Sequence, residues 1–298
     1  MSRWRVPRVA TVAAAVALVA SSCATLPESA RDTGRVRVAA AFYPLAWAAQ
    51  QVGGPDVLVT NLTSPGGEPH DLELTVNETL AVARADLVVY ERGFQPAVDD
   101  VIGNVAEGTL LDAADVVDLR DAVAPDTGAD PHFWLDPSRM AELTDAIAAD
   151  LGRADPRHRA TYDANAAAVR ARLSALDADF ASGLASCQRD TIVVSHDAFG
   201  YLARYGLTIE AISGLSPGAE PSPADLARLQ ELVHDEGITT VFSERLASPR
   251  LAETLASDTG VRTEVLDPVE GLADATADRD YLDLMRANLR SLKEANGC

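Results

Sequence analysis

Short apolar runs alternate with stretches of helical periodicity along most of this chain, and this alternation is the strongest constraint on its fold. Near the start, RVRVAAAFY and DVLVTNLT flank PLAWAAQQVGG, which ends in two glycines. After Cys187 the pattern resumes, with helical stretches between TIVVS, LTIEAIS, TTVFSE and RTEVLD. Repeated strand–helix–strand order predicts an α/β fold, with parallel sheets covered by helices on both faces.

A single long helix is expected between the two alternating halves. Residues 155–184 contain no proline after Pro156, and their one glycine, Gly183, is close to the end. A helix of this length reaches about 40 Å, which suits a strut between two domains. The predicted architecture is therefore two parallel-sheet α/β lobes joined by one long helix.

The predicted domain boundaries fall where these patterns change. Residues 1–22 are expected to form a signal peptide, and residues 23–34 a tether. The N-terminal α/β lobe is predicted over 35–138, the linking helices over 139–186, and the C-terminal α/β lobe over 187–298.

Capping residues mark several helix starts. Thr75 followed by Glu78 forms a capping box, and Asp136 and Ser222 each precede a proline at the first helical turn. The same pattern predicts a helix that begins after Ser248. The stretch VVDL is predicted as a strand and AFGYLARYG as a helix.

The first residues have the pattern of a secretory signal. MSRWRVPR carries three arginines and precedes the run VATVAAAVALVA, which is too short for a lasting transmembrane helix. Cys23 resembles the cysteine of the bacterial lipobox, which becomes lipidated, although Ala20 stands where leucine is usual. We expect lipidation at Cys23, with plain cleavage near Ala24 as the alternative. In both cases the mature protein works outside the cytoplasm.

The charge balance is strongly acidic, with 45 acidic and 25 basic residues and a formal net charge of −20. This argues against nucleic acid as a partner, because binding to phosphates needs clustered Lys and Arg. A well-solvated acidic surface accounts for the charge without any particular partner.

The two remaining cysteines, Cys187 and Cys298, are expected to form a disulfide, because an oxidising compartment favours pairing. The bridge would tie the end of the chain to the start of its second half. In the loop-entropy model it stabilises the fold by about 4–5 kcal/mol. Two free thiols are the alternative.

Four residues that can bind a metal follow strands of the predicted sheets. His70 lies in the loop after DVLVTNLT, and His132 lies between VVDL and the next helix. His196 follows TIVVS, and Asp267 ends the strand RTEVL. Ligands of open parallel sheets bind beyond the carboxyl ends of the strands, so a cleft between the lobes is expected to gather all four residues.

Three neutral imidazoles and one carboxylate form a shell that suits Zn²⁺, which favours tetrahedral N, O and S ligands. The alternative for Asp267 is a turn-capping role before Pro268, with water completing the shell. Glu68 is interpreted as a solvent-facing loop acid, with a role beside the metal as the alternative. Asp71 and Asp197 either orient the neighbouring imidazoles or begin helices.

Three other polar residues are not expected to bind the metal. His158 and His234 lie near predicted helix ends and are expected to be exposed. Glu244 ends a strand that faces the same cleft, but it is not counted among the ligands.

Four segments resemble a known family. GGEPHDLELT, DPHFWLDP, SHDAFGYLARYGL and FSERLASPRLAETLASDTGVRTEVLDP are similar to motifs of the zinc/manganese solute-binding proteins of ABC importers, and they occur in the family's order. The resemblance covers nearly all of the chain after about residue 35. It implies metal ligation by His70, His132, His196 and Asp267, and a histidine at the third position is typical of the zinc branch.

The resemblance also implies a function. It indicates a binding protein, not an enzyme, that passes Zn²⁺ to the membrane permease of an ABC importer. It further implies a rigid backbone helix, a monomer with a lipid anchor in the periplasm or on the outer face of the cell membrane, and a metallochaperone as a further partner. The segment RDAVAPDTGAD departs from the family, because many zinc members are rich in histidine there.

Other functions remain open at this point. A manganese- or iron-binding member and a surface adhesin of the same family are two alternatives. A secreted zinc hydrolase is a third, because a three-histidine site activates water in some enzymes. Against the hydrolase, Asp267 would fill the open position, and no general base is clearly placed.

Overall fold

Two four-stranded parallel sheets form the framework of the computed structural model, which describes residues 1, 4, 34–122 and 128–298. Except for residues 1, 4 and 34, the predicted signal peptide and tether, including Cys23, lie outside the described residues. The compact unit is Gly34–Cys298. No helix in the described part of the chain is both long and apolar enough to cross a membrane.

Each sheet has the strand order of a doubly wound α/β fold. The first sheet runs β2-β1-β3-β4 and the second runs β6-β5-β7-β8, with every neighbouring pair parallel. The strands are β1 Val36–Ala40, β2 Val57–Asn61, β3 Leu87–Tyr90, β4 Thr109–Asp112, β5 Thr191–Val194, β6 Thr208–Ala211, β7 Thr240–Ser243 and β8 Arg262–Val265.

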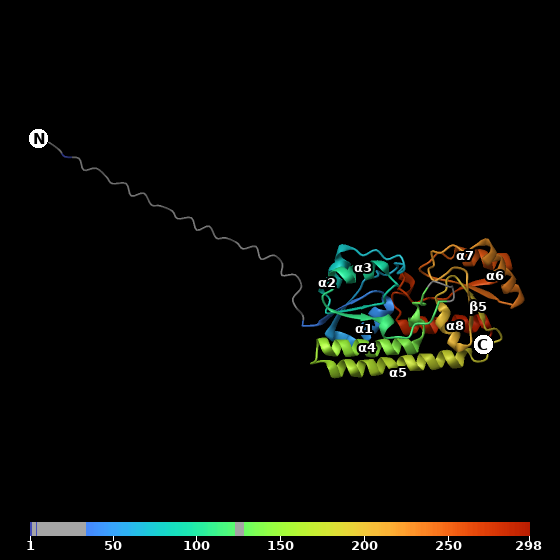
Figure 1. Cartoon of the computed structure of the whole chain (residues 1–298), viewed down its shortest axis with the longest axis horizontal. Helices are drawn as coiled ribbons and strands as arrows, with labels where there is room; N and C mark the ends of the chain where they lie inside the picture. Colours follow the sequence, from blue (N-terminus) through green and yellow to red (C-terminus); the bar gives the residue numbers. More distant parts are fainter. Residues whose placement is uncertain (2–3, 5–33, 123–127) are drawn as a thin grey trace. The chain divides into compact units, whose positions relative to one another are not determined.

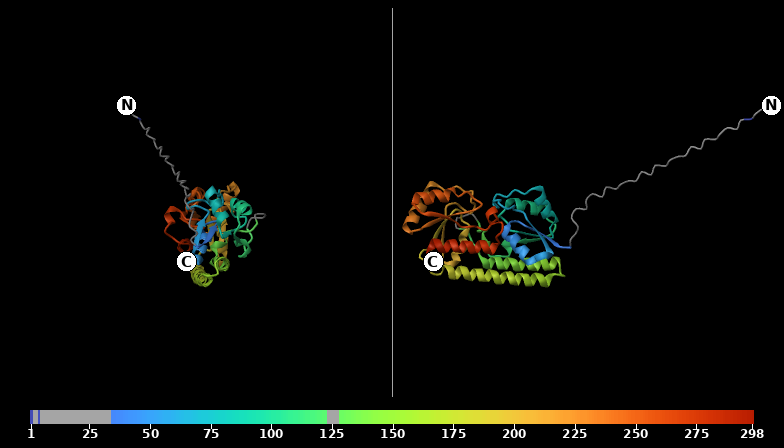
Figure 2. Two further views of the ribbon diagram at one scale, coloured as in Figure 1. Left: turned by 90° about the vertical axis from the view of Figure 1, so that its left-hand side faces the viewer. Right: turned by 180° about the vertical axis from the view of Figure 1, so that it is seen from behind.

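Helices cover both faces of the sheets, as Figures 1 and 2 show. In the first lobe α2 and α3 lie on one side of the sheet, and α1 and α4 lie on the other (Figure 1). The helices are α1 Tyr43–Gly53, α2 Val76–Arg84, α3 Pro96–Val105, α4 Pro137–Ala154, α5 Arg159–Leu184, α6 Pro223–Asp235, α7 Arg250–Thr259 and α8 Tyr281–Asn296. Short 3₁₀ helices occupy Gly54–Asp56, Ala113–Asp115, Phe133–Leu135, Phe199–Tyr205 and Asp274–Thr276.

The long helix α5 runs beneath both lobes (Figure 2). Its 26 residues span about 39 Å at 1.5 Å per residue. Buried side chains recur every three or four positions, which gives one apolar stripe along its whole length. The stripe consists of Tyr162, Ala166, Val169, Leu173, Leu176, Phe180 and Leu184. The architecture of two α/β lobes on one long helix is therefore confirmed.

Polar contacts fasten α5 to both lobes. Asn165 donates from Nδ2 to the carbonyl oxygen of Val52 at 2.9 Å, at the end of α1. Arg172 donates to Gln51 of α1 at 2.8 Å and to Asp280, the N-cap of α8, at 3.1 Å. One guanidinium therefore bridges the first lobe and the second.

Most helix caps agree with the sequence. Thr75 and Glu78 form the predicted capping box at α2, and Ser222 caps α6. The Asp136 side chain accepts from the N–H of Ser138 at the start of α4. The exception is α7, whose N-cap is Pro249 and not Ser248, and which has no side-chain cap.

Two predicted elements were wrong. The fourth strand is Thr109–Asp112, not VVDL, and it enters the sheet at Gly108, where a Cβ would lie 2.3 Å from the carbonyl oxygen of Ala85. The Asp112 side chain then accepts from the N–H of Ala114, which turns the chain into a 3₁₀ helix before VVDL. The stretch AFGYLARYG forms a 3₁₀ helix, not an α-helix, and ends at Gly206 with φ +87°.

A disulfide joins Cys187 to Cys298 across 111 positions, which is the expected pairing. The N–H groups of Gln188 and Arg189 both donate to the carbonyl oxygen of Asn296, at 3.0 and 3.1 Å. The bridge thus reinforces a contact that hydrogen bonds already make. It lies before β5, at the end of the second sheet opposite its carboxyl edge.

We expect the Cys187→Ser/Cys298→Ser double variant to fold but to lose about 4–5 kcal/mol of unfolding free energy, because the unfolded chain is no longer closed into a loop. Urea denaturation followed by circular dichroism measures this loss. Adding dithiothreitol should lower the midpoint of the wild type and leave that of the double variant unchanged. Equal midpoints for the oxidised wild type and the variant would contradict the prediction.

Candidate metal site

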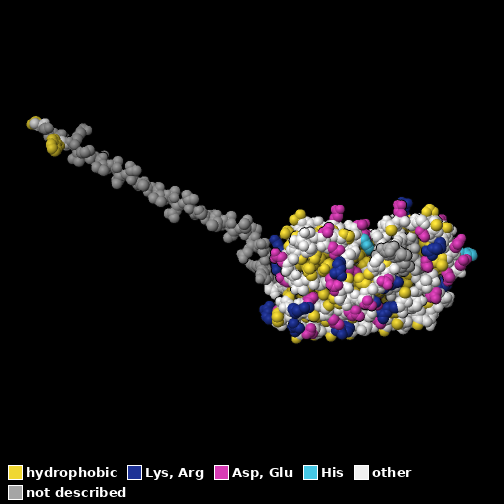
Figure 3. Space-filling model, in the orientation of Figure 1, with side chains coloured by type: hydrophobic (Ala, Val, Ile, Leu, Met, Phe, Trp, Pro, Cys, Tyr) yellow, Lys and Arg dark blue, Asp and Glu magenta, His cyan; other side chains and the backbone are white. Residues whose placement is uncertain are grey.

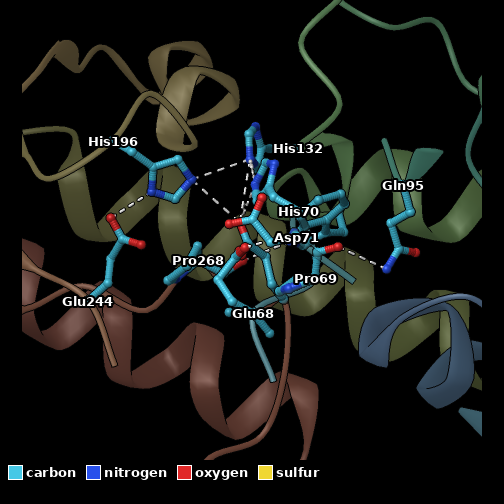
Figure 4. A network of polar contacts seen from close by, with 12 residues as sticks. Glu68, Pro69, His70, Asp71, Gln95, His132, His196, Glu244 and Pro268 are labelled. Atoms are coloured by element: carbon cyan, nitrogen blue, oxygen red, sulfur yellow. Dashed lines mark hydrogen bonds and ion pairs between the residues drawn. The ribbon is translucent and has the colours of Figure 1, made fainter. Parts of the chain in front are cut away.

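Three histidines and one glutamate converge at the carboxyl edges of the two sheets. His70 lies in the loop between β2 and α2, and His132 lies between β4 and α4. From the second lobe, His196 follows β5 and Glu270 follows β8. The four ligand atoms lie within 4.8 Å of one another. Figure 4 shows the three imidazole rings pointing toward a common region.

Five of the six distances between the four ligand atoms are known individually, and all five are short. The Nε2 atom of His132 is 3.4 Å from Nε2 of both His70 and His196. Oε1 of Glu270 lies 3.6, 3.4 and 3.5 Å from the Nε2 atoms of His70, His132 and His196. Ligands about 2.0–2.1 Å from a tetrahedral Zn²⁺ would be about 3.3–3.4 Å apart. The observed edges are therefore close to those of a zinc site.

Carboxylates behind two of the rings set their orientation. Nδ1 of His132 is 2.8 Å from Asp130, and Nδ1 of His196 is 2.6 Å from Glu244. A carboxylate at Nδ1 favours the proton on that nitrogen, so the Nε2 lone pair faces the cluster. Ser195 also donates to the same oxygen of Glu244. Both imidazoles are thus prepared to bind a metal.

Buried negative charge makes a cation at this point favourable. His132, His196 and Glu270 are almost fully buried, and Oε1 of Glu270 has no hydrogen-bond partner. Burial alone would raise the pKa of Glu270, but the adjacent imidazoles hold this pKa well below its usual range. Burial alone would lower the pKa of His196, but Glu244 and Glu270 raise it to about 10. A proton or a metal ion must balance the buried negative charge.

His70 is held differently, by its loop. Gln95 donates from Nε2 to the carbonyl oxygen of Pro69 at 3.1 Å and to the hydroxyl of Thr63 at 3.0 Å, so it fixes the backbone before His70 (Figure 4). The His70 ring meets Phe94 edge-on, with centroids 4.7 Å apart. Its side chain is 10% exposed, whereas those of His132 and His196 are 0% exposed. His70 is therefore the ligand nearest to solvent.

The fourth predicted ligand, Asp267, requires a correction, because the structure does not bring it into the cluster. Its Oδ1 accepts from the N–H of Val269 at 2.9 Å, and its Oδ2 lies 3.2 Å from Nε of Arg245. The carboxylate is therefore engaged in the turn, as the alternative interpretation held. Glu270 occupies the fourth position instead.

The sequence interpretation missed both Glu270 and the partners of the rings. Glu270 lies three residues after Asp267 and directly before Gly271. The presence of two acids in this loop was the sequence feature that could have pointed to Glu270. The pairing of Glu244 with His196 was not anticipated either, although Glu244 was expected to face this cleft. The second Nδ1 partner is Asp130, two residues before its histidine.

The remaining acidic candidates have other contacts. The N–H of Asp71 donates to Glu68 at 3.1 Å, and the N–H of Asp197 donates to the carbonyl oxygen of Gly214 at 3.0 Å. Glu68 is half-buried, and burial raises its pKa. None of these three acids belongs to the cluster that the described residues form.

The two other histidines also lie outside the cluster. His158 is bonded through Nδ1 to Asp155 at 2.6 Å, and its side chain is 37% exposed. The side chain of His234 is 89% exposed. Both are unconnected with the cluster, as expected.

Relatives of known identity share this fold along most of the chain. The zinc-binding lipoprotein AdcA of Streptococcus pneumoniae is 35% identical over 93% of this chain, which spans 60% of the length of that relative. The high-affinity zinc uptake system protein ZnuA of Bacillus subtilis is 30% identical, with 95% of this chain and 96% of the relative covered. The crystal structure of the Zn(II)-bound ZnuA-like domain of pneumococcal AdcA superimposes with a TM-score of 0.77, at 35% identity, covering 89% of this chain and 100% of that one.

The family assignment rests on both fold and sequence. The profile of the family described as zinc-uptake complex component A, periplasmic, matches residues 38–295, which include both sheets and all four members of the cluster. The two lobes, the long helix and the order of the motifs agree with that match. The chain therefore belongs to the ZnuA family of periplasmic zinc-uptake components.

Proposed function

We propose that this protein captures Zn²⁺ outside the cytoplasm and delivers it to the membrane permease of an ABC importer. The observation that carries the proposal is the convergence of three Nε2 atoms and one carboxylate oxygen, which all lie within 4.8 Å of one another, with five of the six separations at 3.4–3.6 Å. Zn²⁺ binds such mixed nitrogen and oxygen shells in tetrahedral geometry. The ion is cargo here, not a resident cofactor.

The composition of the cluster supports zinc over its competitors. Three imidazoles and one carboxylate suit Zn²⁺, whereas Mn²⁺ is better served by carboxylate, carbonyl and water oxygens. The names of the relatives point the same way, since the pneumococcal protein is a zinc-binding lipoprotein and the Bacillus protein a zinc uptake component. Manganese or iron binding and an adhesin role remain the alternatives within the family.

The closed shell also supports a carrier over a hydrolase. A catalytic zinc site keeps one position open for water, but here Glu270 offers a protein oxygen at the fourth corner. Because the related proteins are transport components, a binding role without chemistry is the simplest account.

The predicted cell-surface features belong to the same proposal. We place the mature protein on the outer side of the cell membrane, held by a lipid on Cys23, and acting as a monomer. The permease is its principal partner and a metallochaperone a further one. The division into lobes at residues 138 and 187 stays a prediction, as does cleavage of the signal peptide.

Replacing a buried ligand is the direct test. We expect His132→Ala to weaken Zn²⁺ binding by at least about 100-fold, because loss of a ligand should exceed the 10- to 100-fold cost of losing an outer partner. Competition with a chromophoric zinc chelator measures the affinity, and Mn²⁺ competition measures the metal preference.

The matched control is His234→Ala, which removes an exposed histidine far from the cluster and should leave the affinity unchanged. Equal zinc affinity for the His132→Ala variant and the wild type would refute the proposed site. Displacement of bound Zn²⁺ by equimolar Mn²⁺ would instead overturn the choice of metal.

Zinc binding at pH 7 should release about one proton or more per ion, because zinc needs a neutral imidazole. Burial lowers the pKa of His196, but Glu244 and Glu270 raise it to about 10, so this ring is protonated in the metal-free protein at pH 7. The affinity should rise with pH, and the proton release from His196 should decline as the pH approaches 10. Calorimetry in buffers of different ionisation enthalpy measures the count. A binding enthalpy that does not depend on the buffer would contradict the prediction.

A further inference from the structure

The loop that carries Glu270 contains an unusual backbone conformation. Val269 has φ +60° and is the only non-glycine residue with positive φ among the residues that the structure describes. A β-branched side chain strongly disfavours this left-handed region, so neighbouring contacts must hold it there. Val269 directly precedes Glu270, and its conformation therefore sets the direction in which the Glu270 side chain leaves the backbone.

Asp267 supplies the contact that holds Val269. Its Oδ1 accepts the Val269 N–H at 2.9 Å, and its Oδ2 is anchored by Nε of Arg245 at 3.2 Å. The side chain of Asn288 holds the backbone of Asp267 on both sides. Its Oδ1 accepts from the Asp267 N–H at 2.9 Å, and its Nδ2 donates to the Asp267 carbonyl oxygen at 2.6 Å. The start of the turn is thus fixed to α8.

The first lobe holds the same loop on either side of Glu270. The indole Nε1 of Trp134 donates to the carbonyl oxygen of Pro268 at 2.7 Å. The N–H of Gly66 donates to the carbonyl oxygen of Leu272, also at 2.7 Å. Hydrogen bonds thus hold the backbone both before and after Glu270. The backbone conformation at Val269 therefore largely decides where the Glu270 side chain points.

We propose that Asp267 is a positioning residue that acts on the metal only through Glu270. By accepting the Val269 N–H, its carboxylate keeps the turn in the conformation that aims Glu270 into the cluster. Its two oxygens face the Val269 N–H and Arg245, whereas Oε1 of Glu270 faces the Nε2 atoms of the three histidines. This inference rests on the proposed function, because it concerns the same ion.

A double-mutant cycle separates a positioning residue from an independent ligand. We expect Asp267→Ala to weaken Zn²⁺ binding by about 10- to 100-fold, and Asp267→Asn, which keeps the acceptor oxygen, to cost less than about fivefold. In the Glu270→Ala background, Asp267→Ala should cause no further loss, because the carboxylate it positions is gone. Asp278→Ala, an exposed acid in the turn before α8, is the control and should bind as the wild type does.

The visible spectrum of bound Co²⁺ provides a second measurement. It changes when the ligands of the metal change, but not when a substitution only lowers the stability of the fold. The visible spectrum of the Co²⁺-loaded Asp267→Ala variant should match that of Glu270→Ala, since both lack the carboxylate ligand, and Asp267→Asn should keep the wild-type spectrum. If Asp267→Ala proves unstable without metal, adding Val269→Gly should restore binding in part, because glycine adopts φ +60° without strain.

The outcomes that overturn the inference are distinct. A loss from Asp267→Ala that is equally large with and without Glu270 would make Asp267 an independent ligand. Wild-type affinity and spectrum in the Asp267→Ala variant would remove any role for it. Wild-type protein that binds neither Zn²⁺ nor Co²⁺ would overturn the proposed function itself, and this inference with it.

Discussion

The packing of α5 against both lobes is the constraint on which the site depends. Two of the four cluster members come from each lobe, so the cluster exists only while the lobes keep their separation. The apolar stripe from Tyr162 to Leu184 and the bridging guanidinium of Arg172 maintain that separation. Because α5 is one continuous helix packed against both lobes, it holds the two sheets in the relative position that the site needs.

The charges around the site then determine that it binds a cation. Asp130 and Glu244 lie behind two of the rings, and Glu270 lies in front of all three, so the buried region has an excess of carboxylates over cations. Such a region is stable only when positive charge enters it, as protons or as a metal ion. The carboxylates that orient the rings therefore also supply negative charge that the bound cation neutralises.

Much of this arrangement could be predicted from the sequence, and the exceptions have physical causes. Strand–helix alternation gave the two lobes, and the topological rule for parallel sheets placed His70, His132 and His196 together. The prediction of VVDL as the fourth strand was wrong. The strand starts earlier, directly after Gly108, whose backbone lies close to that of Ala85. The sequence alone could not show whether Asp267 or Glu270 joins the cluster. This depends on the φ angle of Val269, which leaves no pattern in composition or periodicity.

The partial exposure of His70 has a consequence for the path of the ion. The other three cluster members are sealed from solvent, so an arriving cation meets the loop imidazole first and the interior donors afterwards. The way back to solvent passes the same imidazole, in the loop that Gln95 holds at Pro69. The loop that carries His70 therefore lies between the solvent and the buried donors of the shell.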